Sequence, residues 1–252
     1  MLLVTPTSEA MKRQRQVHVN GRDYTLSEYV GAAPVRGHYQ AGNEVNDNGL
    51  PQGFLVDQPP GAVTPAHFHE PNQFQVFVGG KGRIGAFAAT PLTIQYANGH
   101  TPYGPIVAGP EGVRYFTLRQ RWDPGAKYLP ASRDKLIKGN QRTRVKGALE
   151  VGSEAARMSR KSVTVETVFA PEADGLAGCL YRMGPGHTPR MPDPAGSGGI
   201  YFVVAEGSIV YKDQELPRLS TIYSCCEEAR IALIAGATGA DLLVLHFPAL
   251  AN

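Results

Sequence analysis

The sequence is poor in cysteine and has no long apolar run. Its 252 residues include three cysteines, two of them adjacent (Cys225 and Cys226), so the disulfide framework of a small secreted domain is not expected. Its apolar stretches fall well short of the roughly 18 residues that a membrane-spanning helix needs. Only a very short apolar stretch precedes Lys12, which predicts no secretory signal. We therefore expect a cytoplasmic protein with no membrane partner.

Excess charge of one sign is also scarce. The formal net charge is +3 at pH 7, which is too small to be typical of nucleic-acid or membrane-surface proteins. Basic residues do concentrate in segment 133–161, which holds nine basic and three acidic residues. No aromatic residue occurs between 129 and 167, whereas nucleic-acid sites usually place aromatic side chains among the basic ones. We expect a solvated basic linker here and no nucleic-acid partner.

Turn-forming residues are abundant instead. The chain has 29 glycines and 20 prolines, and hydrophobic residues make up 42% of it, enough for a globular core. Short runs rich in β-branched and aromatic residues alternate with turn dipeptides such as Asn-Gly and Gly-Gly. These runs cover residues 54–56, 73–78, 113–118, 163–169, 200–204 and 241–247. The pattern predicts an all-β sandwich or barrel.

An internal repeat predicts two domains of the same kind. Segments 61–82 and 186–207 both begin at a glycine, pass through a polar turn-forming stretch, enter an apolar strand and end at a glycine. Segments 108–112 and 235–239 correspond in the same way, and apolar strands follow both. The expected organisation is an N-terminal arm at 1–50, a first domain at 51–130, a basic linker at 131–161 and a second domain at 162–252.

The first chemically informative motif is His67-Phe68-His69. Residues i and i+2 of a strand share a face, so both imidazoles are expected to point the same way. Gln73 follows across a short turn, and Gln75 lies two residues further on, so an amide oxygen could join the two histidines. Imidazole nitrogen with oxygen ligands suits borderline divalent metals and leaves positions open for substrate. The motif predicts a metal site, with either glutamine as a ligand.

The spacing around these residues resembles a known family. The pattern Gly61-x5-His67-x-His69-x3-Gln73-x6-Gly80 is similar to the first motif of the cupin superfamily, Gly-x5-His-x-His-x3or4-Glu-x6-Gly, with Gln in the position of Glu. This resemblance implies two tandem jelly-roll β-barrel domains, a bicupin, with a metal in the mouth of the N-terminal one.

The second cupin motif is altered. It reads Gly-x5-Pro-x-Gly-x2-His-x3-Asn in the family, and its histidine normally completes the metal site. Segment 98–106 here reads Asn-Gly-His-Thr-Pro-Tyr-Gly-Pro-Ile. We expect His100, a natural ligand type, to be the fourth ligand and Tyr103 to act as catalytic acid or base. The alternative is that Tyr103, which stands closer to the family's histidine position, is itself the ligand.

Other residues complete the predicted site. Arg83 and Arg119 lie on predicted strands of the first domain, and a guanidinium group suits a carboxylate substrate. With Gln75 they form the expected substrate-binding set. In the second copy of the repeat, Pro192 and Pro194 stand at the positions of the two motif histidines. Since proline has no ligating side chain, the second domain is expected to hold no metal.

The resemblance implies an enzyme more readily than a specific reaction. We expect one divalent metal per chain and a small anionic organic molecule as substrate. Our first hypothesis is a non-haem dioxygenase with iron. The second is a metal-assisted lyase or isomerase, for which zinc, manganese or nickel would serve while Tyr103 moves a proton. The third is a non-catalytic cupin that binds a small molecule. A homodimer is common for this fold and is left open.

Overall fold

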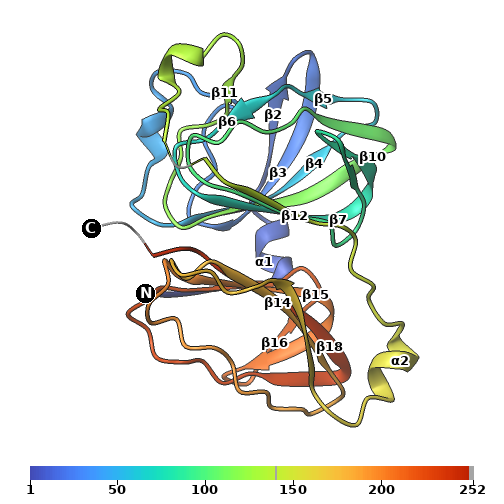
Figure 1. Cartoon of the computed structure of the whole chain (residues 1–252). Coiled ribbons are helices and arrows are strands. Elements are labelled where there is room, and N and C mark those ends of the chain that lie inside the picture. Colours follow the sequence, from blue (N-terminus) through green and yellow to red (C-terminus); the bar gives the residue numbers. More distant parts are fainter. Residues whose placement is uncertain (140, 250–252) are drawn as a thin grey trace. The chain divides into compact units, whose positions relative to one another are not determined.

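β-Strands make up most of the regular structure in residues 1–139 and 141–249, the part of the chain that the computed structural model describes (Figure 1). The helices are short: α1 (Thr7–Met11), α2 (Glu154–Met158) and the 3-10 turns η1 (Asn43–Asn46) and η2 (Arg133–Lys135). None of the described helices has the length and apolar character needed to cross a membrane. The chain forms two units, residues 10–149 (the N-terminal barrel) and residues 1–9 with 150 onward (the C-terminal barrel). Residues 250–252, where the expected second domain ends, lie outside the described part.

The N-terminal barrel is built on one antiparallel sheet. Its strand order is β12-β9-β7-β10-β4-β3-β2, with β5 added to β10 and β8 added to β7. A separate small sheet pairs β6 with β11. The strands are β2 (Gln14–Val19), β3 (Arg22–Val30), β4 (Gln52–Gln58), β5 (Val63–Thr64), β6 (His67–Phe68), β7 (Gln73–Ile84), β8 (Phe87–Ala89), β9 (Ile94–Ala97), β10 (Ile106–Arg119), β11 (Lys127–Tyr128) and β12 (Thr143–Lys146).

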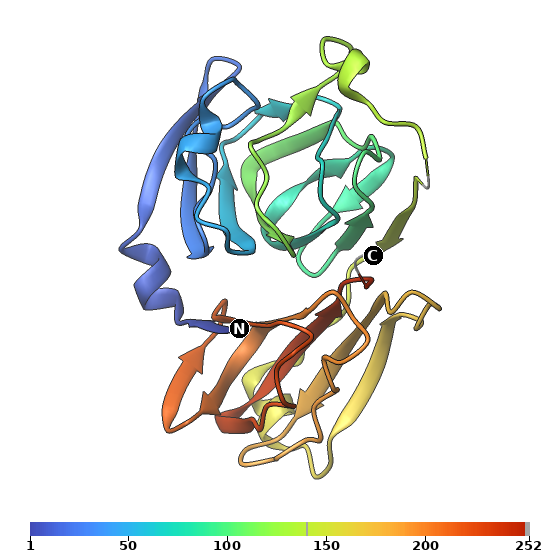
Figure 2. The same ribbon diagram turned by 90° about the vertical axis from the view of Figure 1, so that its left-hand side faces the viewer.

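The C-terminal barrel repeats this order. Its sheet runs β1-β17-β15-β18-β14-β13, with β16 added to β15. The strands are β1 (Leu2–Thr5), β13 (Thr164–Phe169), β14 (Ala177–Met183), β15 (Ile200–Tyr211), β16 (Gln214–Pro217), β17 (Thr221–Ser224) and β18 (Ile234–His246). Figure 2 shows β1, the blue strand at the N-terminus, beside the orange strands of this barrel, in agreement with its pairing to β17.

The segments expected to be an arm and a linker take part in these sheets. Residues 1–9 belong to the C-terminal barrel through β1, whereas β2 and β3 are strands of the N-terminal barrel. Strand β12, within the expected linker 131–161, pairs with β9 as an edge strand. Edge pairing of this kind uses backbone hydrogen bonds, so charged side chains are compatible with it. Because β12 lacks the apolar pattern of an inner strand, the sequence does not predict it.

Both barrels bend their two longest strands at paired glycines. In β7 and β10 the glycines are Gly80 and Gly112, with φ of 66° and 77°, and in β15 and β18 they are Gly207 and Gly239, with φ of 72° and 70°. A Cβ atom at Gly80 or Gly207 would overlap the carbonyl oxygen of the facing glycine. The strand register shifts at the same place in both pairs. Glycine is therefore required here, because the bulge curves each sheet toward closure.

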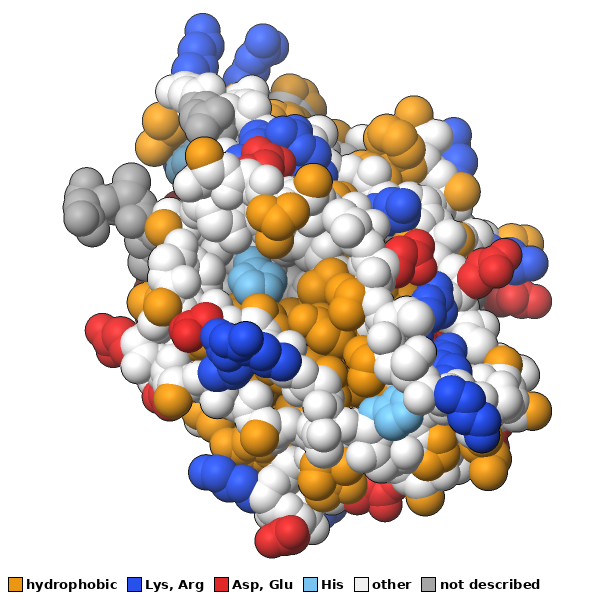
Figure 3. Space-filling model, turned by 60° about the horizontal axis from the view of Figure 1, so that its bottom comes forward, with side chains coloured by type: hydrophobic (Ala, Val, Ile, Leu, Met, Phe, Trp, Pro, Cys, Tyr) orange, Lys and Arg blue, Asp and Glu red, His pale blue; other side chains and the backbone are white. Residues whose placement is uncertain are grey.

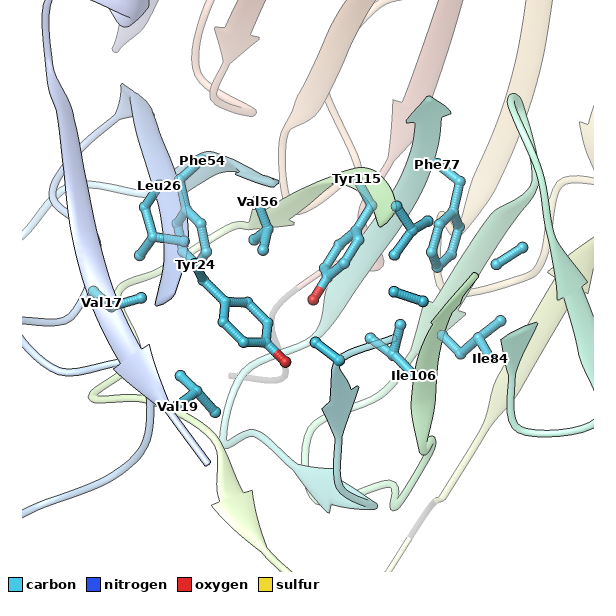
Figure 4. Packing of buried hydrophobic residues seen from close by; sticks show 14 of the residues in the cluster. Val17, Val19, Tyr24, Leu26, Phe54, Val56, Phe77, Ile84, Ile106 and Tyr115 are labelled. Carbon is cyan, nitrogen blue, oxygen red and sulfur yellow. The ribbon is translucent and has the colours of Figure 1, made fainter. Parts of the chain in front are cut away.

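Each barrel has its own hydrophobic core. In the N-terminal barrel, apolar side chains from β2, β3 and β4 face those of β7 and β10, and the rings of Tyr24 and Tyr115 point into the space between them (Figure 4). The C-terminal core is formed mainly by β14, β15, β17 and β18. Figure 3 brings forward the end of the molecule that is lower in Figure 1, where apolar side chains gather in a hollow with histidine at its edge.

Candidate functional site

A cavity of about 60 Å³ lies inside the N-terminal barrel. One wall is apolar and comes from β2, β3 and β4, whose strands are seen on the left of Figure 4. It includes Val17, Val19, Leu26, Phe54 and Val56. The remaining lining includes polar side chains from the sequence motifs and from β10, namely His67, His69, Gln75, Tyr103, Thr117 and Arg119. The cavity thus combines an apolar surface with a concentrated group of hydrogen-bonding side chains, as small-molecule sites commonly do.

His67 is fixed by its neighbours on both sides of the ring. Its backbone exchanges two hydrogen bonds of 3.0 Å with Tyr103, which aligns the two side chains. Its Nδ1 lies 2.6 Å from the carbonyl oxygen of Pro65. Since a carbonyl only accepts, Nδ1 carries the proton and Nε2 keeps its lone pair, 2.8 Å from the Tyr103 hydroxyl. Burial, followed by the neighbouring His69, lowers the pKa of His67 to about 3, so the ring is neutral.

His69 is oriented by a buried carboxylate. Its Nδ1 lies 2.7 Å from Oδ1 of Asp123, which is fully buried and also accepts from the backbone N–H groups of Glu70 and Gly125. Burial alone would raise the pKa of Asp123, but its contacts with His69 and Arg119 hold that pKa below its ordinary value. Burial and then Arg119 lower the pKa of His69 to about 4. The carboxylate thus fixes the tautomer of His69 and leaves Nε2 unprotonated.

Arg119 lies at the end of β10, directly opposite Gln73 of β7, and only 2% of its surface is exposed. Its Nε donates to Oε1 of Gln73 at 3.0 Å, and its Nη1 donates to Oε1 of Gln52. Its Nη2 lies 3.0 Å from Nε2 and 3.1 Å from Nδ1 of His69, so the guanidinium is in contact with that imidazole. A permanent positive charge is therefore held at the polar wall of the cavity.

A directed chain of hydrogen bonds links these groups. A guanidinium only donates, so Gln73 turns its oxygen to Arg119 and its amide nitrogen to the Tyr103 hydroxyl. That hydroxyl in turn donates to Nε2 of His67. Burial raises the pKa of Tyr103 above its ordinary value, so the side chain is a neutral phenol. Tyr103 therefore holds a proton at an atom that faces both a buried imidazole and the cavity.

Of the three remaining predicted residues, Gln75 lies at the cavity, whereas His100 and Arg83 lie outside it. Gln75 lines the cavity, is 3% exposed, and its Oε1 has no hydrogen-bond partner among the described residues. His100 follows β9 in a turn with φ of 57°, its ring lies 5.5 Å from that of Phe68, and its Nδ1 accepts from the backbone N–H of Ile137 at 3.3 Å. Arg83 is exposed on β7. Neither His100 nor Arg83 lines the cavity.

Two residues of the cluster carried no signal in the sequence. Asp123 lies in the loop that follows β10, 54 residues from the histidine that it orients. Gln52 comes from the start of β4, and it reaches Arg119 because β4 and β10 pair in register at these two residues. Only the pairing of distant strands brings them to the site, so neither belongs to a local motif.

The cluster fits a divalent metal in part. Each histidine has its Nδ1 hydrogen-bonded and its Nε2 unprotonated, which is the state of imidazoles that bind metals. A metal would have to displace the present neighbours of these Nε2 atoms, the Tyr103 hydroxyl at His67 and Nη2 of Arg119 at His69. The other cupin ligand positions are weaker, because the Gln73 oxygen already accepts from Arg119 and the Tyr103 hydroxyl keeps its proton. Within residues 1–139 and 141–249, no group of three or more His, Cys, Asp or Glu could hold a metal. A divalent metal held here would take two ligands from the histidines, and its other ligands would have to be the Tyr103 oxygen or atoms of a bound molecule.

No protein-family model matches the sequence, and a search of curated proteins finds no match. Similarity is found among solved structures. A dioxygenase candidate from Nostoc punctiforme has a TM-score of 0.67 at 12% identity, covering 100% of this chain and 84% of that one. The bacterial pirin YhhW from Escherichia coli in complex with nickel(II) has a TM-score of 0.52 at 9% identity, covering 99% of this chain and 100% of that one.

A third similar structure is quercetin 2,3-dioxygenase from Acinetobacter baumannii, with a TM-score of 0.51 at 10% identity. The similarity covers 98% of this chain and 79% of that one. All three similarities extend over almost the whole of the present chain, so they include both barrels. The chain has the cupin fold. The expectation of two tandem cupin barrels is confirmed, while identities of this size show the cupin fold alone.

Proposed function

We propose that the cavity of the N-terminal barrel is the active site of a metal-dependent enzyme that acts on a small anionic organic molecule. The observation that carries this proposal is the pair of neutral imidazoles, each with a partner on Nδ1, beside a buried guanidinium in a cavity. The proposed reaction is a non-haem dioxygenation with iron. The dioxygenase names among the similar structures, and the nickel(II) of the pirin complex, support a metal-dependent reaction of this kind.

Each residue has a role in this proposal. His67 and His69 would hold the metal, and a bound ferrous ion would supply the activation of dioxygen. Arg119 holds the anionic group of the substrate, since a buried cation favours a carboxylate or an enolate as its partner. The apolar wall from β2, β3 and β4 holds the rest of the molecule and excludes water from it. Gln73 donates its amide N–H to the Tyr103 hydroxyl and so fixes the position of that hydroxyl beside His67.

A specific observation favours a second candidate. Tyr103 is a buried phenol whose proton is directed by the chain from Arg119 through Gln73. With a metal on Nε2 of His67 in place of this hydrogen bond, the hydroxyl proton would be available to a substrate in the cavity, which is what a metal-assisted lyase or isomerase needs. In that case the metal need not change its redox state, so zinc, manganese or nickel would serve.

The deciding experiment measures metal content by elemental mass spectrometry on protein purified without added metal. The wild type is compared with the His67→Ala/His69→Ala variant and with His100→Ala, the matched control outside the cavity. Iron that is present in wild type and control and lost from the double variant supports the oxygenase, which is then assayed for oxygen uptake with catechols and diketones. Zinc, nickel or manganese with the same pattern supports the lyase or isomerase. No metal in the wild type, even after reconstitution, contradicts both and leaves a non-catalytic binding cupin.

A further inference from the structure

Four hydroxyl groups that line the cavity already donate hydrogen bonds within the protein. Thr64 donates to Oε1 of Gln58 at 3.1 Å, so the Tyr24 hydroxyl, 3.2 Å from that of Thr64, is the donor in its pair. The Tyr115 hydroxyl also donates to Oε1 of Gln58, at 3.2 Å. The fourth hydroxyl, that of Tyr103, donates to an imidazole nitrogen. A hydroxyl carries a single hydrogen, so these four side chains offer a bound molecule lone pairs and no further proton.

The same lining contains an acceptor that has no donor. The side chain of Gln75 lines the cavity and is 3% exposed, and its Oε1 has no hydrogen-bond partner among the described residues. Gln95 lies directly opposite it on β9, is 5% exposed, and its Oε1 lacks a partner in the same part of the chain. The two amides therefore do not satisfy each other. Because buried acceptors are nearly always paired, we expect the missing donor on the molecule that occupies the cavity.

The lining also indicates that this donor is uncharged. None of the described residues that line the cavity is an aspartate or a glutamate, so an ammonium group bound there would have no carboxylate against it. Asp123 contacts His69 and Arg119 and does not line the cavity. Burying a cation without a counterion costs far more than burying a hydroxyl group that has a partner. A hydroxyl is the donor that fits this environment.

We infer that the substrate of this cavity carries a hydroxyl group that donates to Gln75 from a compact apolar body, and that Gln75 selects such a molecule over its counterpart without the hydroxyl. The inference rests on the proposed function, because it concerns the substrate of the same site. The hydroxyl donates to Oε1 of Gln75, and the body lies against the apolar wall from β2, β3 and β4 (Figure 4). A molecule that lacks the hydroxyl leaves the buried oxygen unpaired, and a site discriminates against such an analogue for that reason. Gln75 is thus a specificity-determining residue.

Calorimetric titration of the protein as purified with small acids that share one carbon chain tests this inference. The probes are 3-hydroxybutanoate, butanoate, 3-methoxybutanoate, which accepts a hydrogen bond but does not donate one, and 3-aminobutanoate, which donates from an ammonium group. We expect the hydroxy acid to bind about 3- to 10-fold more tightly than butanoate, which corresponds to one hydrogen bond between neutral groups. The methoxy and amino acids should bind no more tightly than butanoate.

Two variants locate the preference at Gln75. Gln75→Met removes the acceptor and should abolish the preference, because the hydroxy acid loses affinity and butanoate does not. The matched control is Gln120→Met, since Gln120 is also buried, both of its amide atoms lack partners within residues 1–139 and 141–249, and it does not line the cavity. The preference should persist in the control. It should also persist in the wild type after a chelator has removed the metal, because Gln75 and not a metal ion receives the hydroxyl.

The outcomes separate this inference from the proposed function. Equal binding of 3-hydroxybutanoate and butanoate, a preference that survives Gln75→Met, or one that requires the metal overturns the role of Gln75 and leaves the proposed metal enzyme standing. Tighter binding of 3-aminobutanoate overturns the assignment of an uncharged donor. A preference that depends on Gln75 in protein that binds no metal supports the inference and contradicts the proposed enzyme. If none of the acids binds, the inference and the anionic substrate of the proposed function are both wrong.

Discussion

The two barrels have the same strand order but different interiors. At the end of the long strand pair, β7 and β10 place Gln73 opposite Arg119, whereas β15 and β18 place Ile200 opposite His246. Two residues further along β7, Gln75 is flanked by Thr117 of β10 and Gln95 of β9. The equivalent residue of β15 is apolar, and so are both of its cross-strand neighbours; the three are Phe202, Val244 and Ile222.

The comparison shows which features the fold itself requires. Paired glycines at the bend occur in both barrels, so they belong to the fold. Gln73, Gln75 and Arg119 occupy positions that hold Ile200, Phe202 and His246 in the C-terminal barrel, so an equivalent sheet closes without these polar groups. A buried acceptor such as Oε1 of Gln75, which has no partner in the described part of the chain, costs about 1–3 kcal/mol of stability. Polar groups that the fold does not need and that reduce its stability are expected at functional sites.

Among the substitutions that test this comparison, Arg119→Leu is expected to have the largest effect on stability. The change leaves oxygen atoms of Gln73 and Gln52 without their donor and removes the cation beside Asp123. Breaking a buried charged network in this way should lower the free energy of unfolding of the N-terminal barrel by about 3–5 kcal/mol. The single tryptophan, Trp122, lies in this barrel, so its fluorescence during denaturant unfolding reports on the barrel by itself.

The matched change in the other barrel is His246→Leu, at the position that corresponds to Arg119. There the facing residue is apolar, so we expect a loss of less than about 1 kcal/mol. Calorimetry follows this variant, because the C-terminal barrel has no tryptophan among residues 1–9 and 150–252. Equal losses in the two variants would mean that the polar wall is no more critical to its barrel than an ordinary inward position.

Asp123→Asn is expected to have the next largest effect, on metal binding. An amide in place of the carboxylate weakens the hold on Nδ1 of His69 and leaves Arg119 less well balanced. Losing such an orienting partner typically reduces metal affinity by about 10- to 100-fold. Nickel titration measures the change, with Asp57→Asn as control, since Asp57 forms a partly exposed ion pair with Arg114 on the same barrel. A similar loss in the control would show that the effect is not specific to His69.

These residues also show how far the sequence could predict the site. His67, His69 and Gln73 are close in sequence, so the spacing alone predicted that they would lie together, and the structure places them in one cluster. His100 is a ligand type, which is why the sequence suggests it, but it lies in a turn with positive φ and its ring contacts that of Phe68. Arg119 was grouped with Arg83 as a strand arginine, and only the register of β10 against β7 and β4 distinguishes the buried one.

The fold was predictable to a similar degree for a similar reason. Turn dipeptides and β-branched runs are local signals, and they correctly predicted an all-β chain with two tandem barrels. The pairing of β1 with β17 joins residues more than two hundred positions apart, from Leu2–Ser224 to Thr5–Thr221. No local pattern encodes that choice of partner. A strand joins a sheet at an edge strand whose backbone N–H and C=O groups are unpaired, and which strand forms the edge depends on how the rest of the sheet is paired.

A smaller change, a gain in stability, is expected from a substitution that makes the interior of the N-terminal barrel more like that of the C-terminal barrel. Gln75→Met replaces the acceptor that has no partner with an apolar side chain of similar length, as the C-terminal barrel has Phe202 at this place. We expect the N-terminal barrel to gain about 1 kcal/mol, because the cost of burying that oxygen is removed. Trp122 fluorescence again gives the measurement. A loss of stability would show that Gln75 makes a favourable contact in the folded protein, and the argument from its unpartnered oxygen would fail.

The smallest effect concerns the chemistry of one side chain in the C-terminal barrel. Cys179 on β14 pairs with Val244 of β18, as Phe54 on β4 pairs with Thr117 of β10, so the thiol occupies the place of a cavity-wall residue. Burial raises the pKa of Cys179 to about 11, and the thiolate is the reactive form. At about pH 8 we expect a thiol reagent to modify the exposed Cys226 first and Cys179 much more slowly. Mass spectrometry of the labelled peptides measures both rates. If Cys179 were labelled as fast as Cys226 in the folded protein, the prediction would be wrong, because the reagent would then have free access to the interior of the C-terminal barrel.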